Sequence, residues 1–379
     1  MKKSGLTTME VKKINRHRVY DVIYKNKSIS KQEIAYKLTM GLTTVTQNLK
    51  SLEEDGWICK TGYYESTGGR KAQSIEIVKN ARTAIGVFIL KHKFLLRAVN
   101  LYGEVIKKSE VKIDFDTTEE YYKNLGREVM MFANSIDSNP EHILGVGIAI
   151  QGIISPDGKS VIYGKLLAHT DSTEIKLEDI ARYIPYECTL EHDSKAAGFA
   201  EVWKTKPQDA FIILTNKNLG SALVINGEVH HGKSMCSGTV EHMCVRPNGK
   251  KCYCGNSGCL DAYCAADSLM EQIKEDSFDD FFENKNNGDK ENQEIWNNYL
   301  DIMSDAIINI NTVFDCDIII SGLLASYFTD EDILYMQKRI SNSLFYSKRV
   351  INITIGHHGE SAPAVGVAFP FIKRLIESI

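Results

Sequence analysis

Five of the chain's nine cysteines and one histidine lie close together in residues 241–264, EHMCVRPNGKKCYCGNSGCLDAYC. Structural zinc is held by four thiolate or imidazole ligands in a closed tetrahedron. The spacing His-x9-Cys-x-Cys-x4-Cys selects His242, Cys252, Cys254 and Cys259 as such a set. The segment therefore predicts a Zn²⁺ site, and the alternative is a group of reduced, buried structural cysteines.

Glycines punctuate this segment, and two cysteines fall outside the ligand spacing. Gly255 and Gly258 give the backbone tight turns between the thiolates. Cys244 follows His242 by two residues and Cys264 lies on a predicted helix, so we interpret both as packing residues. The odd number of cysteines suits metal binding better than a disulfide framework.

The amino-acid composition indicates the number of domains and the cellular compartment. The chain has 379 residues, 43% hydrophobic and 25% charged, enough for two or three domains with proper cores. The start, MKKSGLTTMEV, lacks an apolar run, and the longest apolar runs, ILGVGIAI and CDIIISGLLA, are much shorter than the roughly 20 residues that span a membrane. We expect a cytoplasmic protein without a membrane partner, with its thiols reduced.

The net charge of −4 hides an uneven distribution. Residues 1–79 hold 15 Lys and Arg against 8 Asp and Glu, while residues 80–379 hold 30 against 41. A basic amino-terminal module on an acidic body indicates a nucleic-acid partner for the first part and a different partner for the second.

The basic module has the pattern of a winged helix-turn-helix domain, residues 1–79. Val11, Ile14, Val19, Val22 and Ile23 recur at helical spacing. Ser30 and Glu33 form a capping box before a helix over about 31–38, and a third helix starts in LTTVTQNLKSLEEDG, with Val45, Leu49 and Leu52 inward and Gly56 at its end. WICKTGYY and AQSIEIV would be the strands of the wing, with ESTGGRK at its tip.

The outward face of the third helix carries side chains that read base edges or bind phosphate in the major groove. At the wing tip, Gly68 and Gly69 allow a close approach to the duplex, and an arginine there can enter the minor groove. The alternative is a solvated helix and an ordinary basic hairpin without a role in DNA binding. The predicted DNA-binding residues are Ser30, Lys31, Thr43, Thr44, Thr46, Gln47, Lys50, Gly69, Arg70 and Lys71.

From about Ala84 strands and helices alternate, which predicts a two-lobed α/β body with a ligand cleft between the lobes. The expected lobes are residues 80–200 and 201–379, with the carboxy-terminal helix returning to the first lobe. The polar run ENKNNGDKENQ, residues 283–293, has no apolar period and predicts a surface loop.

Four features together resemble the ROK family of repressors and sugar kinases, and most of all its xylose-repressor branch. These are the winged helix with STGGRK at its wing, then EHDSKAAGFAE, SGTVEHM and CYCGNSGCLDAY. The resemblance covers nearly the whole chain. It implies an actin-like, sugar-kinase-like body and the same four zinc ligands, with the metal bracing the loop that contacts sugar.

The resemblance also implies a sugar site in the cleft, although the sequence keeps only part of the family pattern. Asp193 matches the catalytic base of the kinases and His242 is kept, whereas His192, Thr239 and Asp261 replace Asn, Glu and Glu. The predicted sugar-binding residues are therefore His192, Asp193, Thr239, His242 and Asp261. The alternative is a satisfied polar network without a ligand.

The kinase pattern is broken at the phosphate loops. A family kinase needs an Asp-x-Gly-Gly-Thr-like loop after its first strand, where this chain reads AIGVFILKHK. The second phosphate region reads LTNKNLGSAL, with Asn218 and Leu219 in place of small residues. We therefore expect no enzyme activity and no catalytic residue.

The sequence thus predicts a zinc-containing repressor of carbohydrate genes, a homodimer or dimer of dimers that binds a double-stranded operator. A sugar between the lobes would alter operator affinity. One alternative is a ROK sugar kinase with an added DNA-binding domain, and another is a DNA-binding protein with a degenerate body that binds no ligand.

Overall fold

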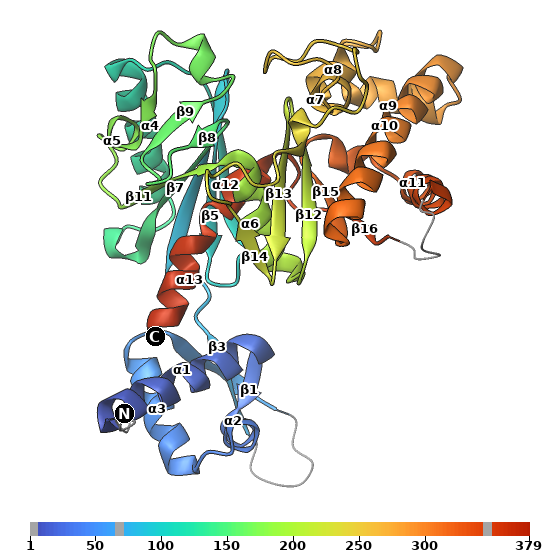
Figure 1. Ribbon diagram of the computed structural model, residues 1–379. Coiled ribbons are helices and arrows are strands. Elements are labelled where there is room, and N and C mark those ends of the chain that lie inside the picture. The colour runs from blue at the N-terminus through green and yellow to red at the C-terminus, as the bar shows by residue number, and fades with distance from the viewer. Residues whose placement is uncertain (1–6, 65–71, 344–350) are drawn as a thin grey trace, which may run out of the picture. The chain divides into compact units, whose positions relative to one another are not determined.

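The computed structural model describes residues 7–64, 72–343 and 351–379, and it divides into two compact units. The first unit comprises residues 1–83, 100–104 and 370–379, and the second comprises 84–99 and 105–369. This division differs from a simple break at residue 79, because a turn of the body and the last ten residues group with the amino-terminal helices. Figure 1 colours the chain from blue to red along its length.

The described part of the first unit contains three amino-terminal helices, the carboxy-terminal helix from residue 370 onward, and a three-stranded antiparallel sheet with the order β1-β3-β2. Thr7 with Glu10 and Ser30 with Glu33 form capping boxes that fix the starts of α1 and α2. The strand β1, which pairs with β3, was not expected from the sequence. The elements are α1 (Thr8–Asn26), β1 (Ser28–Ser30), α2 (Lys31–Leu38), α3 (Leu42–Glu54), β2 (Ile58–Tyr63) and β3 (Gln73–Ile77).

The core of this unit confirms most of the expected inward residues. Val19, Ile23 and the apolar face of α3 are buried. Val11 and Ile14, which recur at the same helical spacing, are exposed, because the first turns of α1 extend beyond the part of the helix that packs on the other elements. The wing tip, with Gly68, Gly69, Arg70 and Lys71, lies outside the described residues.

The second unit contains two five-stranded sheets, as the two-lobed α/β prediction requires. The first sheet has the order β11-β7-β4-β5-β6, with β7 and β11 parallel. Its strands are β4 (Thr83–Ile89), β5 (Lys93–Asn100), β6 (Val105–Lys112), β7 (Ile143–Ile150) and β11 (Cys188–His192). The second sheet has the order β14-β13-β12-β15-β16, with strands β12 (Ala210–Thr215), β13 (Leu219–Ile225), β14 (Glu228–His230), β15 (Asp317–Ser321) and β16 (Ile353–Ile355).

Helices cover both faces of each sheet, because neighbouring residues of the buried strands point to opposite faces. On one face of the first sheet lie α4 (Glu119–Asn134) and, near it, α5 (Leu177–Ile180). A small third sheet with the order β10-β9-β8 follows β7 in the chain. Its strands are β8 (Ile153–Ile154), β9 (Ser160–Tyr163) and β10 (Ile175–Lys176). The outer face of the second sheet packs against α7 (Asp261–Cys264), α8 (Ala266–Met270), α9 (Phe278–Asn286), α10 (Lys290–Phe314) and α11 (Asp330–Ser343).

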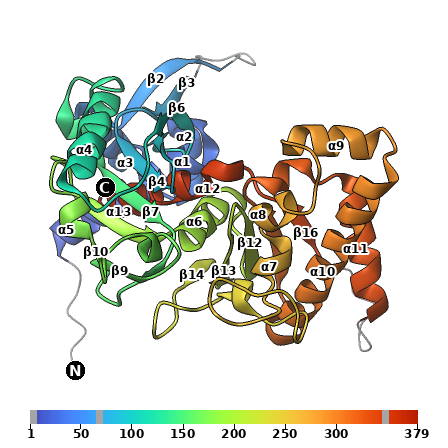
Figure 2. The same cartoon turned by 90° about the horizontal axis from the view of Figure 1, so that it is seen from above.

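Two helices occupy the inner faces of both sheets, α6 (Asp193–Thr205) and α12 (Ala362–Gly366). Figure 2 shows them between the sheets. The two helices approach closely, since a Cβ on Gly366 of α12 would lie 1.6 Å from the carbonyl oxygen of Ala196 in α6. The helix α12 is equally close to β4, where a Cβ on Gly86 would lie 1.6 Å from the carbonyl oxygen of Ala364. The carboxy-terminal segment thus packs on the first sheet through α12, and the chain then enters α13 (Phe369–Ser378).

The prediction of a loop at residues 283–293 is wrong. The segment forms the end of α9 and the start of α10, with a short turn at 287–289. Asp289 caps α10, and the buried Asn292 side chain donates to Glu275 at 2.6 Å and to the Phe281 carbonyl at 3.4 Å. These polar side chains serve as caps and buried partners, which hydrophobic periodicity does not detect.

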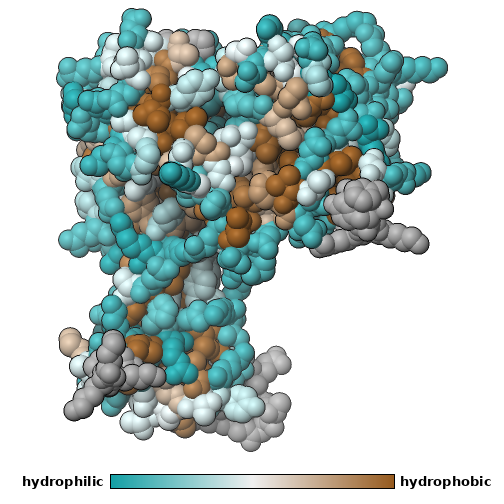
Figure 3. All heavy atoms as spheres, viewed as in Figure 1, coloured by the Kyte–Doolittle hydropathy of each residue, from teal (hydrophilic) through white to brown (hydrophobic). Residues whose placement is uncertain are grey.

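In the described part of the chain, no helix combines the length and the apolar character needed to cross a membrane. Hydrophobic side chains lie in scattered groups among hydrophilic ones on the face shown in Figure 3.

Candidate functional site

The four predicted zinc ligands converge on one point of the second lobe. The ligand atoms of His242, Cys252, Cys254 and Cys259 all lie within 4.8 Å of one another. Cys252 Sγ is 3.7 Å from His242 Nδ1, and Cys254 Sγ is 3.7 Å from Cys259 Sγ. Four ligands about 2.3 Å from a zinc ion at tetrahedral angles would lie about 3.8 Å apart. The donor set and its spacing therefore fit a tetrahedral zinc ion.

Local backbone structure explains how these ligands meet. Gly255 and Gly258 have φ of +92° and +80°, which favours glycine, and they turn the chain between the thiols. The Tyr253 hydroxyl lies 3.3 Å from His242 Nε2, so Nδ1 faces the thiols while the other ring nitrogen has its own partner. Burial lowers the pKa of His242, which favours the neutral imidazole that a metal binds.

The packing assignment holds for one of the two remaining cysteines of the segment. Cys264 is fully buried in the core of the second lobe. Cys244 is exposed, so its assignment as a packing residue is wrong.

Next to this cluster, a cavity of about 150 Å³ opens between the lobes. The carboxyl ends of β7 and β11 point toward it, the usual position for a ligand in an open α/β sheet. The wall includes four of the five predicted sugar contacts, His192, Asp193, Thr239 and His242. The other lining residues are Gln151, Gly152, Ile153, Tyr163, Gly164, Leu219, Cys236, Glu241 and Tyr253.

Asp261 does not line this cavity. Its side chain is buried behind the wall, where Oδ1 accepts a hydrogen bond of 2.8 Å from the backbone N–H of Leu219. Asp261 thus holds the start of β13, and Leu219 forms the wall in its place. Burial raises the pKa of Asp261 to about 6.

Acidic groups dominate the chemistry of the cavity. Asp193, at the start of α6, accepts a 2.7 Å hydrogen bond from the Ser194 N–H, and burial raises its pKa to about 7. Glu241 accepts from the Ser221 hydroxyl at 2.5 Å, and burial likewise raises its pKa to about 7. Burial lowers the pKa of the neighbouring Lys195, while the charge of Glu241 opposes this shift. Such carboxyls suit the recognition of hydroxyl groups.

The imidazole of His192, in the cavity wall, is held in its neutral form. Its Nδ1 lies 2.6 Å from the Ser194 hydroxyl, and burial lowers its pKa to about 3. Thr239 uses its hydroxyl to donate to the Cys236 carbonyl at 3.1 Å. Both predicted contacts therefore already have one protein partner.

The sequence analysis missed Gln151, Glu241 and Tyr253. Gln151 directly follows the buried strand β7, and this position was a usable signal, because ligands gather beyond the carboxyl ends of parallel strands. Glu241 and Tyr253 adjoin predicted metal ligands in the sequence, and only the folded loop shows that they reach the cavity.

A second cavity of about 200 Å³ shares Gln151 with the first. It lies between the β4–β5 turn and the β12–β13 turn, the two segments that the sequence analysis compared with the kinase phosphate loops. Leu90, Lys91 and His92 form the whole first turn, which the Leu90 N–H closes on the Lys93 carbonyl at 2.9 Å. Lys165 crosses the cavity to Asn218 at 2.8 Å.

In the first unit, the predicted DNA-binding helix is α3, and most of the residues predicted to face DNA are exposed to solvent. Thr43, Thr46, Gln47 and Lys50 are exposed and Thr44 is half-buried. The Thr46 hydroxyl donates to the Leu42 carbonyl at 2.7 Å, and Lys50 pairs with Glu54 at 3.7 Å. Ser30 is buried as the cap of α2, and Lys31 follows it.

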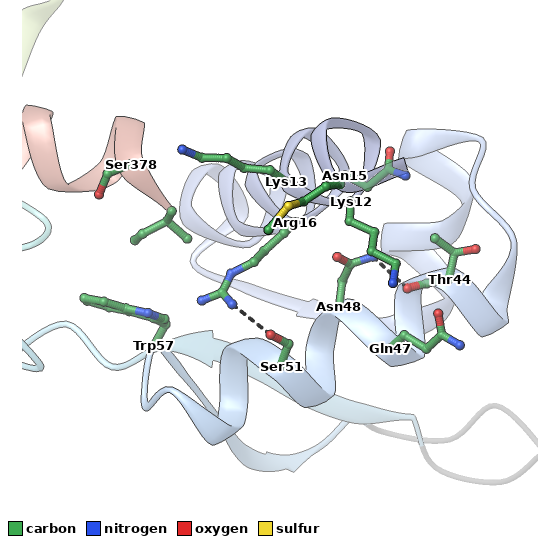
Figure 4. Close-up of a pocket in the computed structure, with 12 residues that line it drawn as sticks. Lys12, Lys13, Asn15, Arg16, Thr44, Gln47, Asn48, Ser51, Trp57 and Ser378 are labelled. Carbon is green, nitrogen blue, oxygen red and sulfur yellow. Dashed lines mark hydrogen bonds between the residues drawn. The ribbon is translucent and has the colours of Figure 1, made fainter. Parts of the chain in front are cut away.

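A groove of about 780 Å³ runs along this unit between α1 and α3 (Figure 4). Lys12, Lys13 and Arg16 of α1 line the groove, and Lys12 points toward Thr44 and Gln47 of α3 (Figure 4). Arg16 joins the helices, because its guanidinium donates to the Ser51 hydroxyl at 2.8 Å and pairs with Asp55 at 2.5 Å. The lysines of α1 were not among the predicted DNA contacts, although the charge of this helix was a signal for them.

Comparison with known proteins places both units. A model described as "ROK family" matches residues 84–374, more than half of the chain. The chain belongs to the ROK family. A model described as winged helix-turn-helix DNA-binding matches residues 13–58, so the fold predicted for each part is confirmed.

Among curated ROK relatives is the "DNA-binding transcriptional dual regulator NagC" of Escherichia coli K12, 26% identical over 69% of this chain and 64% of the relative. The chain therefore spans somewhat less than two thirds of that relative. The xylose repressor of Bacillus subtilis strain 168 is 24% identical over 70% of this chain and 69% of the relative.

The solved ROK structures support the fold. A ROK family transcriptional regulator, a homolog of the Escherichia coli MLC protein, superposes with a TM-score of 0.75 at 19% identity and covers 97% of both chains. A ROK family glucokinase from Streptomyces griseus, in complex with glucose and AMPPNP, gives a TM-score of 0.65 at 19% identity over 76% of this chain and 98% of that chain.

Proposed function

We propose that this protein is a transcriptional repressor of carbohydrate genes whose operator affinity is changed by a sugar bound between the lobes. The observation that carries this proposal is the union, in one chain, of a winged helix with an open reading helix and a ROK body with a carboxyl-lined cavity. Relatives named as a DNA-binding regulator and as a xylose repressor support it. A repressor of this kind acts on chromosomal DNA in the cytoplasm.

DNA binding is assigned to the winged helix, with α3 in the major groove and the basic residues of α1 near the backbone. Exposed Gln47 offers both donors and acceptors to a base edge, whereas Lys50 offers a charge to phosphate. Two copies of the chain would read two half-sites, as a homodimer or dimer of dimers. Light scattering of the protein alone and on its operator tests this assembly.

The sugar would bind in the cavity at the ends of β7 and β11. Asp193 and Glu241 would accept hydrogen bonds from sugar hydroxyls, with His192 and Thr239 setting which sugar fits. Both lobes contribute to the wall, so a ligand that bridges them favours a closed arrangement. A coupling of about 1–3 kcal/mol is enough to change operator occupancy severalfold or more.

Zinc would be held by His242, Cys252, Cys254 and Cys259, and its role would be architectural. All four positions are protein ligands, which leaves no open position for chemistry. The ion would fix the loop that carries His242 and Tyr253 into the cavity wall.

We further propose that the protein transfers no phosphoryl group. The β4–β5 turn has only Leu90, Lys91 and His92, without the glycines whose backbone N–H groups receive phosphates. The test is a coupled assay with ATP, Mg²⁺ and a panel of sugars. Turnover that disappears in Asp193→Asn would establish the kinase alternative, because Asp193 has the position and environment of a general base.

The proposal is tested by selecting operator DNA from a random library with the full-length protein and titrating it with neutral and phosphorylated sugars. We expect at least one sugar to shift the operator Kd, and the shift to be lost in Asp193→Ala. A sugar that shifts wild type and Asp193→Ala equally would place the effector elsewhere. If no sugar binds, the body is only a scaffold.

A further inference from the structure

Exposed Cys244 lies directly opposite a predicted metal ligand. Cys244 and Cys259 are partners in an antiparallel bridge. The Leu260 N–H donates to the Met243 carbonyl at 2.9 Å, and the Val245 N–H donates to the Gly258 carbonyl at 2.8 Å. Because these bonds join the flanking residues, Cys244 and Cys259 form a non-hydrogen-bonded pair, in which the Cα atoms are about 4.5 Å apart and the side chains share a face.

This geometry fits a disulfide. Disulfides join residues whose Cα atoms are about 4.4–6.8 Å apart, and the two side chains of such a pair must point to the same side. The Cys244 sulfur lies over the turn that leads to its partner, since a Cβ on Gly258 would be 3.2 Å from Cys244 Sγ. Exposure differs between the two, because Cys259 is 1% exposed and Cys244 faces solvent.

We propose that Cys244 and Cys259 form a peroxide-responsive thiol pair that controls the metal centre. The Cys244 thiol, the accessible one, attacks hydrogen peroxide and becomes a sulfenic acid as the O–O bond breaks and water leaves. The Cys259 thiolate then attacks the Cys244 sulfur, so that the S–S bond forms, the S–O bond breaks and hydroxide leaves. Two thiol sulfurs are oxidised while one peroxide is reduced, and a thiol reductant reverses the reaction.

The disulfide would remove one of four metal ligands. The three remaining ligands hold zinc less tightly, and a site with missing ligands loses the folding energy that the metal supplies. Because His242 and Tyr253 of the same loop line the cavity, the oxidised protein would also lose its sugar response. This regulation goes beyond the proposed repressor function.

The experiment treats full-length protein with hydrogen peroxide and follows zinc release with a chromogenic chelator. Disulfides are then mapped by proteolysis and mass spectrometry without reduction, which links residues 234–250 to residues 252–274. In wild type we expect a Cys244–Cys259 linkage and zinc release that dithiothreitol plus zinc reverses. Cys244→Ser should slow release about tenfold or more, because the ligand thiolates lack an accessible partner. Cys188→Ser, which removes a half-buried thiol of β11, should behave like wild type.

Two outcomes would overturn the proposal. One is a linkage confined to Cys252, Cys254 and Cys259 with Cys244 still reduced, and the other is equal zinc release in wild type and Cys244→Ser. The mapping is repeated on protein treated with a chelator, so that the pair is tested even if the purified protein holds no zinc. A missing metal would then contradict the zinc proposal alone, and a missing disulfide would contradict the thiol pair alone.

Discussion

Asp193 is a buried carboxyl that nevertheless lines a cavity. It lines a cavity at the start of a helix, and burial raises its pKa to about 7. Its protonation state is therefore expected to change near pH 7. Glu241 has the same property in the opposite lobe wall, and the buried Lys195 lies beside it.

Sugar affinity is expected to rise as the pH increases through about 7. The raised pKa keeps Asp193 protonated below this point, and the ionised carboxylate above it accepts stronger hydrogen bonds from hydroxyls. Asp193→Ala should weaken binding about tenfold and reduce the pH step. Calorimetric titration on either side of neutrality measures both effects. Affinity that is independent of pH in wild type would contradict this role.

Each predicted metal ligand should be needed for a bound ion. Cys254→Ser and His242→Ala should each abolish zinc, measured by elemental analysis, and should lower the thermal stability of the body, because a structural metal contributes directly to folding. Cys188→Ser keeps its zinc as the matched control. Protein purified under reducing conditions without zinc would contradict the prediction.

The sequence predicts the positions of some of these side chains and not of others, and the reasons are physical. The convergence of His242, Cys252, Cys254 and Cys259 was predictable because their spacing is local and their chemistry is specific. Asp261 was misassigned, since a carboxylate that holds the Leu219 backbone and one that meets a ligand have the same sequence pattern. Only folding decides which N–H group lies within reach.

The helix α3 separates its exposed polar residues clearly from its buried apolar ones. Gln47 is exposed within its groove, and Lys50 is paired with Glu54 across one helical turn. Its helix boundary and inward residues were predicted well, because an apolar stripe of period 3.6 identifies such a helix. The end of α9 and the start of α10 were missed, since their caps and buried amides are polar.

Gln47→Ala should cost about 1–3 kcal/mol on the selected operator and relax base preference at one position. Lys50→Ala should weaken all sequences alike and reduce the slope of log Kd against log salt by about one, since it removes one phosphate contact. Anisotropy titrations over a series of salt concentrations separate the two. Equal loss of specificity in both variants would show that α3 is placed differently on DNA.

Across the molecule, the cavity connects to the winged-helix unit along the chain itself. Asp193 opens α6, α6 approaches α12 closely, and only Val367 and Ala368 separate α12 from α13. The residues of α13 from 370 onward belong to the winged-helix unit. This continuity gives the proposed ligand site a short covalent route to the unit proposed to bind DNA.

Gly366→Val should therefore uncouple the two activities. A side chain there would collide with the Ala196 carbonyl, and the overpacked contact should cost about 1–3 kcal/mol in the free energy of unfolding. We expect operator binding to persist while its response to sugar is reduced, measured by titration with and without ligand. Gly62→Ala, which meets no atom within 4 Å, serves as the stability control. A full sugar response in folded Gly366→Val would exclude this route.

The separation between cavity wall and α6–α12 contact has a practical consequence for biosensor engineering. The wall is built largely from loop residues such as Gln151, Thr239 and Tyr253. The contact between α6 and α12 is made by small residues instead, with Gly366 against the Ala196 carbonyl and Ala197 in one buried cluster with Ala362. Ligand preference can therefore be redesigned in the loops without changing the contact between α6 and α12. Libraries that randomise the wall and spare Gly366 should yield sensors for new ligands at a higher frequency than libraries spread over the whole body.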